Sequence, residues 1–271
     1  MQQLAEQART GAVVRRNSRG GAGAAEHLIA ALRCLYNYAV ADGLLTTAGN
    51  PAAQVYKPRR QDSTRQALAH EPLAQLIDVA VNTGNDPDLD RLILRLHLET
   101  ACRRGGALAL RRRDLESQQC LVWLREKGQT SRWQPVSPTL AASLLLHLNS
   151  RADTSTDLDS PLLRYRHGRP ITGRRYDYLF KRVGQYLPWV ATRGVSIHWI
   201  RHTTLTWVER NYGQAVARKY AGHGLAPRAQ ATATYVKATL EEVADALSAF
   251  TGEPHPLAGQ GQPYDIRLPL P

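Results

Sequence analysis

The sequence predicts a mainly helical protein with one small antiparallel β-sheet, an α+β fold. Two observations carry this prediction. Apolar residues recur at helical spacing along most of the chain, whereas apolar and polar residues alternate in one short region, residues 120–126. No internal repeat is visible. The chain has 271 residues, 43% of them hydrophobic and 21% charged, so it is long enough to bury a sizeable core and has the composition of a globular protein.

The first predicted helix covers residues 24–40, and Asp42-Gly43 and Asn50-Pro51 each offer a stop after it. Residues 57–65 are polar and basic and contain a proline. We interpret this stretch as a linker between two domains, although its composition would fit an ordinary surface loop equally well.

The next two predicted helices each begin at a proline. Pro72 lies in the first turn of one helix, and Asp86-Pro87 begins the other. Residues 120–126 and 132–136 form a predicted β-hairpin, with its turn at Lys127-Gly128-Gln129. Helical patterns resume at residues 139–148, 173–187, 199–210, 213–221 and 239–250. The tail is rich in proline and is expected to be poorly ordered.

The charge balance indicates a polyanionic partner. Lys and Arg number 35 against 23 Asp and Glu, which gives a formal charge of +12 and a pI near 10.0. Basic surfaces bind nucleic acid by releasing condensed counterions, although a soluble protein can also simply be basic. The three cysteines lie far apart, and neither a signal peptide nor a membrane-spanning run is present. We therefore expect a cytoplasmic protein.

Two features suggest phosphate chemistry. His198 and Arg201 stand at positions i and i+3, which places them about 5–6 Å apart on one face of a helix. Arg103 stands where an apolar helix is expected to end and another to start, and a guanidinium matches phosphate oxygens in a bidentate manner. Arg111–Arg113 come shortly after it and include at least one residue of an ordinary solvated basic face. Tyr235, taken alone, is an aromatic residue that precedes a helix.

Together these residues resemble the tyrosine recombinase (phage integrase) family. The order is an arginine in a Thr-x-x-Arg segment, a lysine on a β-turn, a His-x-x-Arg pair, a Gly-His pair and a later tyrosine, and it extends over residues 69–250. The resemblance implies the fold of the tyrosine recombinase catalytic domain. It also implies a catalytic set of Arg103, Lys127, His198, Arg201, His223 and Tyr235, with Tyr235 as the nucleophile.

The resemblance implies a domain organisation as well. Residues 1–60 are expected to form part of the helical core-binding domain that clamps DNA. A linker at residues 61–68, a catalytic domain at residues 69–252 and a proline-rich tail at residues 253–271 follow. The N-terminal part is shorter than the four-helix clamp of the family, so we expect a reduced clamp or a reading frame that starts late.

The implied activity is site-specific recombination, in which DNA strands are cleaved and rejoined through a 3′-phosphotyrosyl intermediate. A phenol has a pKa near 10, so about one tyrosine in a thousand is ionised at neutral pH, and attack on a phosphodiester needs a proton acceptor. His198 could accept this proton, Lys127 could donate one to the departing 5′ oxygen, and the arginines could stabilise the phosphoryl oxygens. No Asp and Glu cluster accompanies the motifs, so the sequence predicts neither a metal nor a cofactor.

The expected partner is double-stranded DNA, bound by a homotetramer on paired sites and located at the nucleoid. Accessory DNA-bending proteins are compatible with this expectation, as is integration of a mobile element. Five basic residues are candidate contacts to the DNA backbone, and surface solvation explains them equally well: Arg104, Arg132, Arg174, Arg175 and Lys181.

Two departures from the family pattern lead to alternative hypotheses. Gly106 stands where the family usually has an acid that orients the histidine. Glu99 is a candidate substitute, although a position on the surface of a helix is the more expected one for it. His223 and Tyr235 are twelve residues apart, about three more than is usual in the family. One alternative is therefore an impaired DNA-binding relic. A type IB topoisomerase, which shares the tyrosine and arginine chemistry, is a further alternative. The apolar stripe after Tyr235 would suit packing on its own domain or on a neighbouring protomer.

Overall fold

The computed structural model describes residues 22–58, 65–126, 130–151, 157–222 and 237–260. The chain divides into two compact units, Met1–Thr64 and Arg65–Pro271. The boundary between these units falls within the polar segment that we interpret as a linker.

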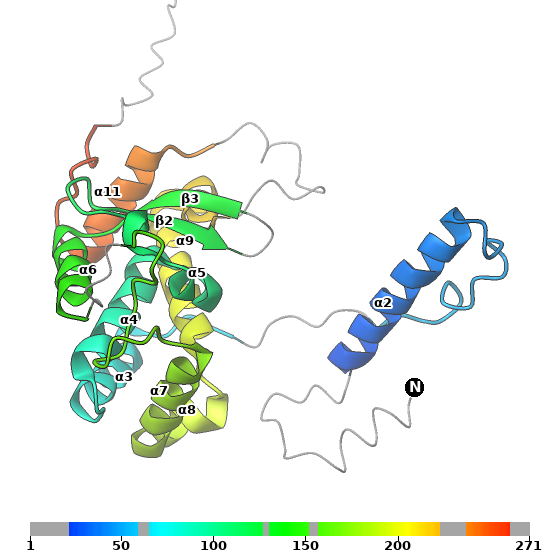
Figure 1. Cartoon of the computed structure of the whole chain (residues 1–271), viewed down its shortest axis with the longest axis horizontal. Coiled ribbons are helices and arrows are strands. Elements are labelled where there is room, and N and C mark those ends of the chain that lie inside the picture. Colours follow the sequence, from blue (N-terminus) through cyan, green and yellow to red (C-terminus); the bar gives the residue numbers. More distant parts are fainter. Residues whose placement is uncertain (1–21, 59–64, 127–129, 152–156, 223–236, 261–271) are drawn as a thin grey trace, which may run out of the picture. The chain divides into compact units, whose positions relative to one another are not determined.

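The N-terminal unit contains one long helix, α2 (Ala22–Ala41), at the place where the sequence predicts it (Figure 1). Arg33 on this helix holds the turns that follow, because its guanidinium donates to the carbonyl oxygens of Ala52 at 3.1 Å and Val55 at 2.8 Å. The side chain of Asn50 accepts from the Ala52 amide at 3.0 Å. Several large apolar side chains of this unit remain exposed, among them Leu35, Tyr38, Leu44 and Tyr56.

The C-terminal unit is mostly helical, as predicted. Proline starts α4 at its first position, and α8 also begins at a proline, where α7 has just ended. Helices α3 and α4 pack on each other, and α3 also contacts α7 (Figure 1). The bounds are α3 (His70–Asn82), α4 (Pro87–Thr100), α6 (Pro138–Arg151), α7 (Gly173–Tyr186) and α8 (Pro188–Arg193).

The sheet has three antiparallel strands in the order β1-β2-β3. The predicted hairpin is confirmed, with β2 (Leu121–Glu126) paired to β3 (Thr130–Pro135). Val122 and Leu124 point into the core, whereas the neighbouring Trp123 contacts Trp133 across the strands, edge to face at 5.1 Å between ring centroids. The two-residue strand β1 (Leu115–Glu116) pairs with β2 and was not predicted.

The longest element, α9 (Ile197–Ala221), consists of two helical segments that meet at Gly213. Gly213 has φ 78° and ψ 172°, a conformation that side chains disfavour, so the two predicted segments at residues 199–210 and 213–221 are confirmed with a glycine at their junction. Helix α11 (Leu240–Thr251) packs on α9 and β3 of its own unit. Its apolar stripe is therefore buried within its own unit, in a small core with Val208 and Tyr220.

Buried ion pairs fasten α4 to the elements around it. The Asp90 carboxylate is fully buried and binds two guanidiniums of α7, Arg175 at 2.6 Å and Arg182 at 2.8 Å. Asp86, just before α4, binds Arg151 of α6 through both carboxylate oxygens. These pairs set α7 and α6 against α4.

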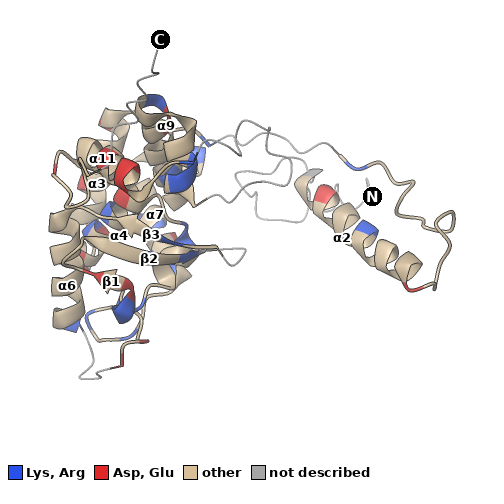
Figure 2. Cartoon of the chain, turned by 90° about the horizontal axis from the view of Figure 1, so that it is seen from above, with Lys and Arg blue, Asp and Glu red and all other residues tan. Residues whose placement is uncertain are grey.

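Two short elements lie between α4 and the sheet in the sequence. They are α5 (Arg104–Leu108) and the 3₁₀ turn η1 (Arg112–Asp114). Figure 2 shows Lys and Arg (blue) on the C-terminal unit, along α9 and beside β3, and acidic residues (red) on α11. None of the helices in the described ranges combines the length and the apolar character that a membrane span requires.

Candidate active site

His198 and Arg201 lie on the first two turns of α9, on one side of the helix. Their neighbours Ile197, Trp199 and Ile200 are buried in the main core, which directs the polar pair to the opposite side. His198 is half-buried, and Arg201 is 7% exposed. The helix therefore presents an imidazole and a guanidinium together, as the spacing of the two residues predicts.

The Arg201 guanidinium joins the ends of two helices. It donates to the carbonyl oxygen of Ala101, which follows α4, and to that of Ala221, the last residue of α9, at 2.8 Å. Ala101 adopts a left-handed conformation with φ 48° that turns the chain toward Arg103. Arg103, the residue before α5, is half-buried. The structure thus brings Arg103 to the turn that Arg201 holds.

Positive charge surrounds His198. Burial lowers the pKa of its imidazole, and the charges of Arg65, Arg104, Arg201 and His202 lower it further. The pKa of His202 is also lowered by burial, and then by Arg65 and Arg201. Because each of these neighbours is a cation or a histidine, the site repels protons and attracts anions. A neutral imidazole is the form that can accept a proton.

Neutralising Arg104 is expected to raise the pKa of His198. Its positive charge disfavours the imidazolium form, so its removal in Arg104→Gln makes that form easier to reach. If His198 must be neutral for cleavage, the acidic limb of the rate profile will move to higher pH. The measurement is the single-turnover rate of covalent adduct formation on saturating DNA, from mildly acidic to neutral pH.

Asp177→Asn is the matched control, since Asp177 pairs with Arg104 at 3.2 Å. This variant keeps the guanidinium and removes its counter-charge, so the acidic limb is expected to stay in place or to move to lower pH. An unchanged acidic limb in Arg104→Gln would show that cleavage does not depend on the charge at Arg104.

The acid that the family pattern places beside the histidine is replaced by Gly106, which is buried within α5. Glu99 does not take over this role. Its carboxylate accepts from Arg95 at 2.6 Å and from the Ser137 amide at 2.8 Å. Burial raises the pKa of Glu99, although these hydrogen bonds oppose the rise. Glu99 is thus buried in a structural network, which rules out both a surface position and a partnership with His198.

Three predicted catalytic residues, Lys127, His223 and Tyr235, lie outside the described residues. The neighbouring elements are described. Strand β2 ends just before Lys127, and strand β3 begins at Thr130. Helix α9 ends just before Gly222-His223. The described chain resumes after Tyr235 at Lys237, shortly before α11.

A model described as the phage integrase family matches residues 66–241, well over half of the chain. The chain belongs to the phage integrase family. Among curated relatives, the tyrosine recombinase XerC of Chlamydia trachomatis serovar L2 is 29% identical over 178 residues, which cover 64% of this chain and 55% of the relative. XerC of Chromobacterium violaceum is 28% identical over 177 residues, covering 64% and 57%. The chain thus spans just over half the length of these relatives.

Solved integrase structures show the same fold. A lambda integrase dimer bound to a COC′ core site aligns with a TM-score of 0.57 at 16% identity, covering 75% of this chain and 73% of that one. The Tn1549 transposon integrase in complex with a circular intermediate DNA aligns with a TM-score of 0.59 at 13% identity, covering 82% and 76%. The predicted tyrosine recombinase catalytic-domain fold is confirmed.

The basic residues expected to contact DNA in this integrase-family chain fall into two groups. Arg104, Arg174 and Lys181 are on the outside of the fold, and the latter two lie on α7. Arg175, in contrast, is 4% exposed and is held by Asp90, Asn85 and the Asp86 carbonyl. The expectation of a DNA contact at Arg175 is therefore wrong, because its guanidinium is used inside the protein.

Arg132 is also engaged within the protein. Its guanidinium donates to the carbonyl oxygen of Tyr220 at 3.0 Å and to that of Thr100 at 3.4 Å, and both bonds are partly buried. We therefore do not retain Arg132 as a contact to the DNA backbone.

Two residues whose charges affect His198, Arg65 and His202, were not predicted from the sequence. His202 directly follows Arg201, and its proximity could have been inferred from that position on the helix. Arg65 is separated from His198 by 133 positions, close to half of the chain. No local pattern connects the two, and only the tertiary fold places the charge of Arg65 where it affects both histidines.

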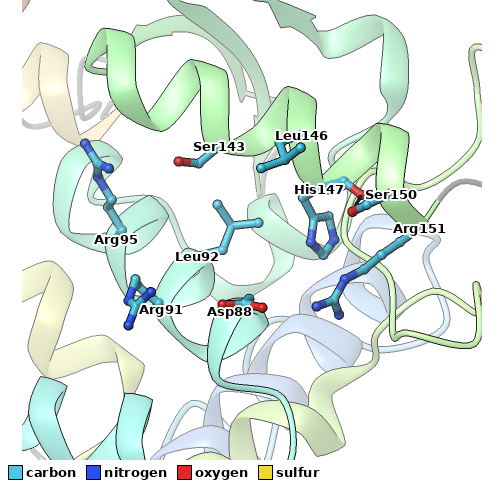
Figure 3. A pocket seen from close by; sticks show the side chains of 9 residues that line it. All are labelled: Asp88, Arg91, Leu92, Arg95, Ser143, Leu146, His147, Ser150 and Arg151. Atoms are coloured by element: carbon cyan, nitrogen blue, oxygen red, sulfur yellow. Dashed lines mark hydrogen bonds between the residues drawn. The ribbon is translucent and has the colours of Figure 1, made fainter.

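A hollow of about 280 Å³ lies between α4 and α6, away from this cluster. Asp88, Leu92 and His147 point into it (Figure 3). His147 accepts from the Arg164 amide at 3.1 Å through Nε2, and burial followed by the charge of Arg151 lowers its pKa to about 4. None of the described catalytic candidates lines this hollow, so we do not include it in the active site.

The donor set of the site suits a phosphate. In the described ranges, no group of three or more His, Cys, Asp and Glu side chains lies close enough to hold a metal ion. Guanidiniums and imidazoles are the polar groups that meet at the start of α9, and both kinds of group can donate hydrogen bonds to phosphoryl oxygens.

Proposed function

We propose that this chain is a site-specific DNA recombinase that cleaves and rejoins strands through a 3′-phosphotyrosyl intermediate on Tyr235. The observation that carries the proposal is the cluster of His198 and Arg201 with Arg65 and Arg104 at the start of α9, next to the turn that bears Arg103. A diester phosphate is an anion, and its charge spreads over more oxygens during attack. Fixed cations at that position stabilise the developing charge.

In the proposed reaction, the Tyr235 hydroxyl attacks the scissile phosphorus and the bond to the 5′ oxygen breaks. His198 accepts the tyrosine proton, and its lowered pKa keeps it in the neutral form that this role needs. Lys127 donates a proton to the departing 5′ oxygen. Arg103, Arg201 and His223 hold the phosphoryl oxygens. Attack by a 5′ hydroxyl of another strand then reverses these steps and releases Tyr235.

The assembly that we propose is a homotetramer on two paired duplexes, with the protein located on DNA in the cytoplasm. Support comes from a lambda integrase tetramer bound to a Holliday junction, which shares the fold with a TM-score of 0.57 at 16% identity. We further propose that the N-terminal unit, which carries α2, contacts the duplex. Integration of a mobile element is the role that fits the family name.

A library of randomised duplexes with a nick near the centre tests this function and leaves the target sequence to be selected by the protein. Cleavage next to a nick releases a short fragment and traps the enzyme on the DNA. We expect a complex that survives denaturant, a set of related trapped sequences, and a DNA-linked peptide that contains Tyr235 by mass spectrometry. Salt-sensitive binding without a covalent complex would refute the proposed catalysis.

Binding without a covalent complex would favour the hypothesis of an impaired DNA-binding relic, which a specific observation also supports. Gly106 leaves His198 without the acid expected from the family pattern, and Glu99 is engaged elsewhere. Relaxation of supercoils by the protein on DNA that lacks paired sites would instead favour topoisomerase-like strand passage.

A further inference from the structure

Two helix ends converge beside the candidate active site. Helix α4 ends at Thr100, and α9 ends at Ala221, each followed by a residue in the left-handed conformation, Ala101 with φ 48° and Gly222 with φ 63°. The last carbonyl groups of a helix have no partner inside it and carry the negative end of its dipole. Two such ends side by side need donors, and cationic donors suit them best.

Two arginines supply these donors. Arg201 bonds the carbonyls of Ala101 and Ala221, and Arg132 bonds those of Thr100 and Tyr220, one residue earlier in each helix. The Tyr220 hydroxyl adds a third connection by donating to the Glu99 carbonyl. Arg201 is a proposed catalytic residue. Arg132 reaches the same two ends from the sheet, so it connects a third element to the junction.

The place of Arg132 in the hairpin is well defined. It lies in β3 opposite Leu124, and its Nε donates to the Gln134 Oε1 at 3.1 Å. The guanidinium then passes directly over Gly222, so that a Cβ atom at this position would overlap Nη1. The left-handed φ favours glycine, and a larger residue at this position would displace the Arg132 guanidinium. The chain therefore leaves α9 underneath the Arg132 side chain.

We infer that Arg132 is a positioning residue for strand cleavage, which holds the ends of α4 and α9, up to Gly222, against strand β3. This inference rests on the proposed function. His223 directly follows Gly222 and leads to Tyr235, and Lys127 stands at the turn of the hairpin that carries Arg132. Arg132 thus holds the last described residues before His223, and it lies in the strand that follows Lys127 in the sequence.

Arginine is needed for this role because one guanidinium reaches three acceptors on three segments: Tyr220, Thr100 and Gln134. Lysine has the same charge but a single nitrogen on a flexible stem, so it cannot reproduce the planar fork. A residue that only supplied charge to DNA would tolerate lysine. This difference separates positioning from phosphate binding.

The first test compares Arg132→Met and Arg132→Lys with Arg113→Met, which removes a charge from an exposed residue outside the site. Small misplacements of reacting groups cost about 10²-fold in rate, so we expect both Arg132 variants to form the covalent adduct roughly 30- to 100-fold more slowly. Arg113→Met should stay within about twofold of the parent. A lysine variant with the parental rate would overturn the inference.

DNA binding gives a second criterion. Each lost phosphate contact reduces the slope of log affinity against log salt by about 0.9. We expect this slope and the dissociation constant of both Arg132 variants to match those of the parent. A slope smaller by one contact would mean that Arg132 binds the DNA backbone, and would overturn the positioning role.

Gly222→Ala tests the junction from its other side, because the added methyl group displaces the Arg132 guanidinium. If both substitutions break one contact, the double variant Gly222→Ala/Arg132→Met should be little slower than the slower single variant. Losses that multiply would show that the two residues act independently, contrary to the inference.

Hydrogen–deuterium exchange provides a measure that needs no catalysis. In the absence of DNA, Arg132→Met is expected to accelerate exchange in the last turn of α9 and to leave α7 unchanged. Parental exchange in that turn would overturn the inference even if cleavage were slow. If the parent protein forms no adduct but Arg132→Met still accelerates exchange in that turn, the junction is supported and the proposed recombinase activity is refuted.

Discussion

Arg201→Ala is expected to lower the rate of covalent adduct formation about 10³-fold, the size of effect seen when one preorganised donor to a developing oxyanion is removed. Two of the acceptors that orient Arg201 are the neutral carbonyls of Ala101 and Ala221, which do not cancel its positive charge. We expect this charge to act on the scissile phosphate. The measurement is single-turnover adduct formation on a nicked duplex recovered from the library, with Tyr235→Phe as the background.

The DNA dissociation constant of Arg201→Ala is expected to change little, because Arg201 is only 7% exposed and we expect the exposed basic residues to make most of the backbone contacts. Two carbonyls lose a partner in this variant, so rates must be compared well below its unfolding temperature. Arg201→Lys keeps the charge without the fork and should also be slow. Affinity that falls in step with the adduct rate would mean that Arg201 serves docking and not chemistry.

Asp90→Asn is expected to destabilise the C-terminal unit by about 3–5 kcal/mol, the usual cost of removing one partner from a buried ion pair. The Asp90 carboxylate is fully buried between Arg175 and Arg182, which are 4% and 6% exposed. The neutral amide leaves two buried guanidiniums without a counter-charge. Thermal unfolding should show a midpoint lower by roughly 6–20 °C.

Asp88→Asn is the matched control for this variant. Asp88 lies on the same helix two residues earlier but is exposed, and its substitution should change the free energy of unfolding by less than about 0.5 kcal/mol. Equal stabilities of the two variants would contradict the view that Asp90 fastens α7 to α4.

The long helices could be predicted from sequence because their apolar periodicity is local information. Pro87 and Gly213 also gave usable boundaries. The start of a helix after Arg103 was predicted, and α5 confirms it, although two of its five residues are glycines with low helix propensity. It forms because Gly106 and Ala107 are buried in the tertiary structure. Strand β1 has two residues, too few for any alternation to show.

The residues of the candidate site also differ in whether local sequence information is enough to recognise their role. His198 and Arg201 stand in one short motif, so their proximity was accessible from sequence, whereas a place for Arg103 in the same site was implied only by the family resemblance. Arg175 could not be recognised as buried, because the carboxylate that binds it, Asp90, lies 85 positions earlier in the chain. The partners of Arg132 at the ends of α4 and α9 are equally remote in sequence. What a basic side chain does depends on such long-range partners.

The gathering of like charges at the start of α9 has a consequence for the folded protein itself. Arg65, Arg104 and Arg201 repel one another and the imidazolium forms of both histidines, so the DNA-free fold carries an internal electrostatic cost at this point. A bound polyanion relieves that repulsion. Substrate binding and conformational stability are then thermodynamically linked, and the fold should be tighter on DNA than off it. On this view the DNA that we propose as substrate also acts as a structural ligand of the protein.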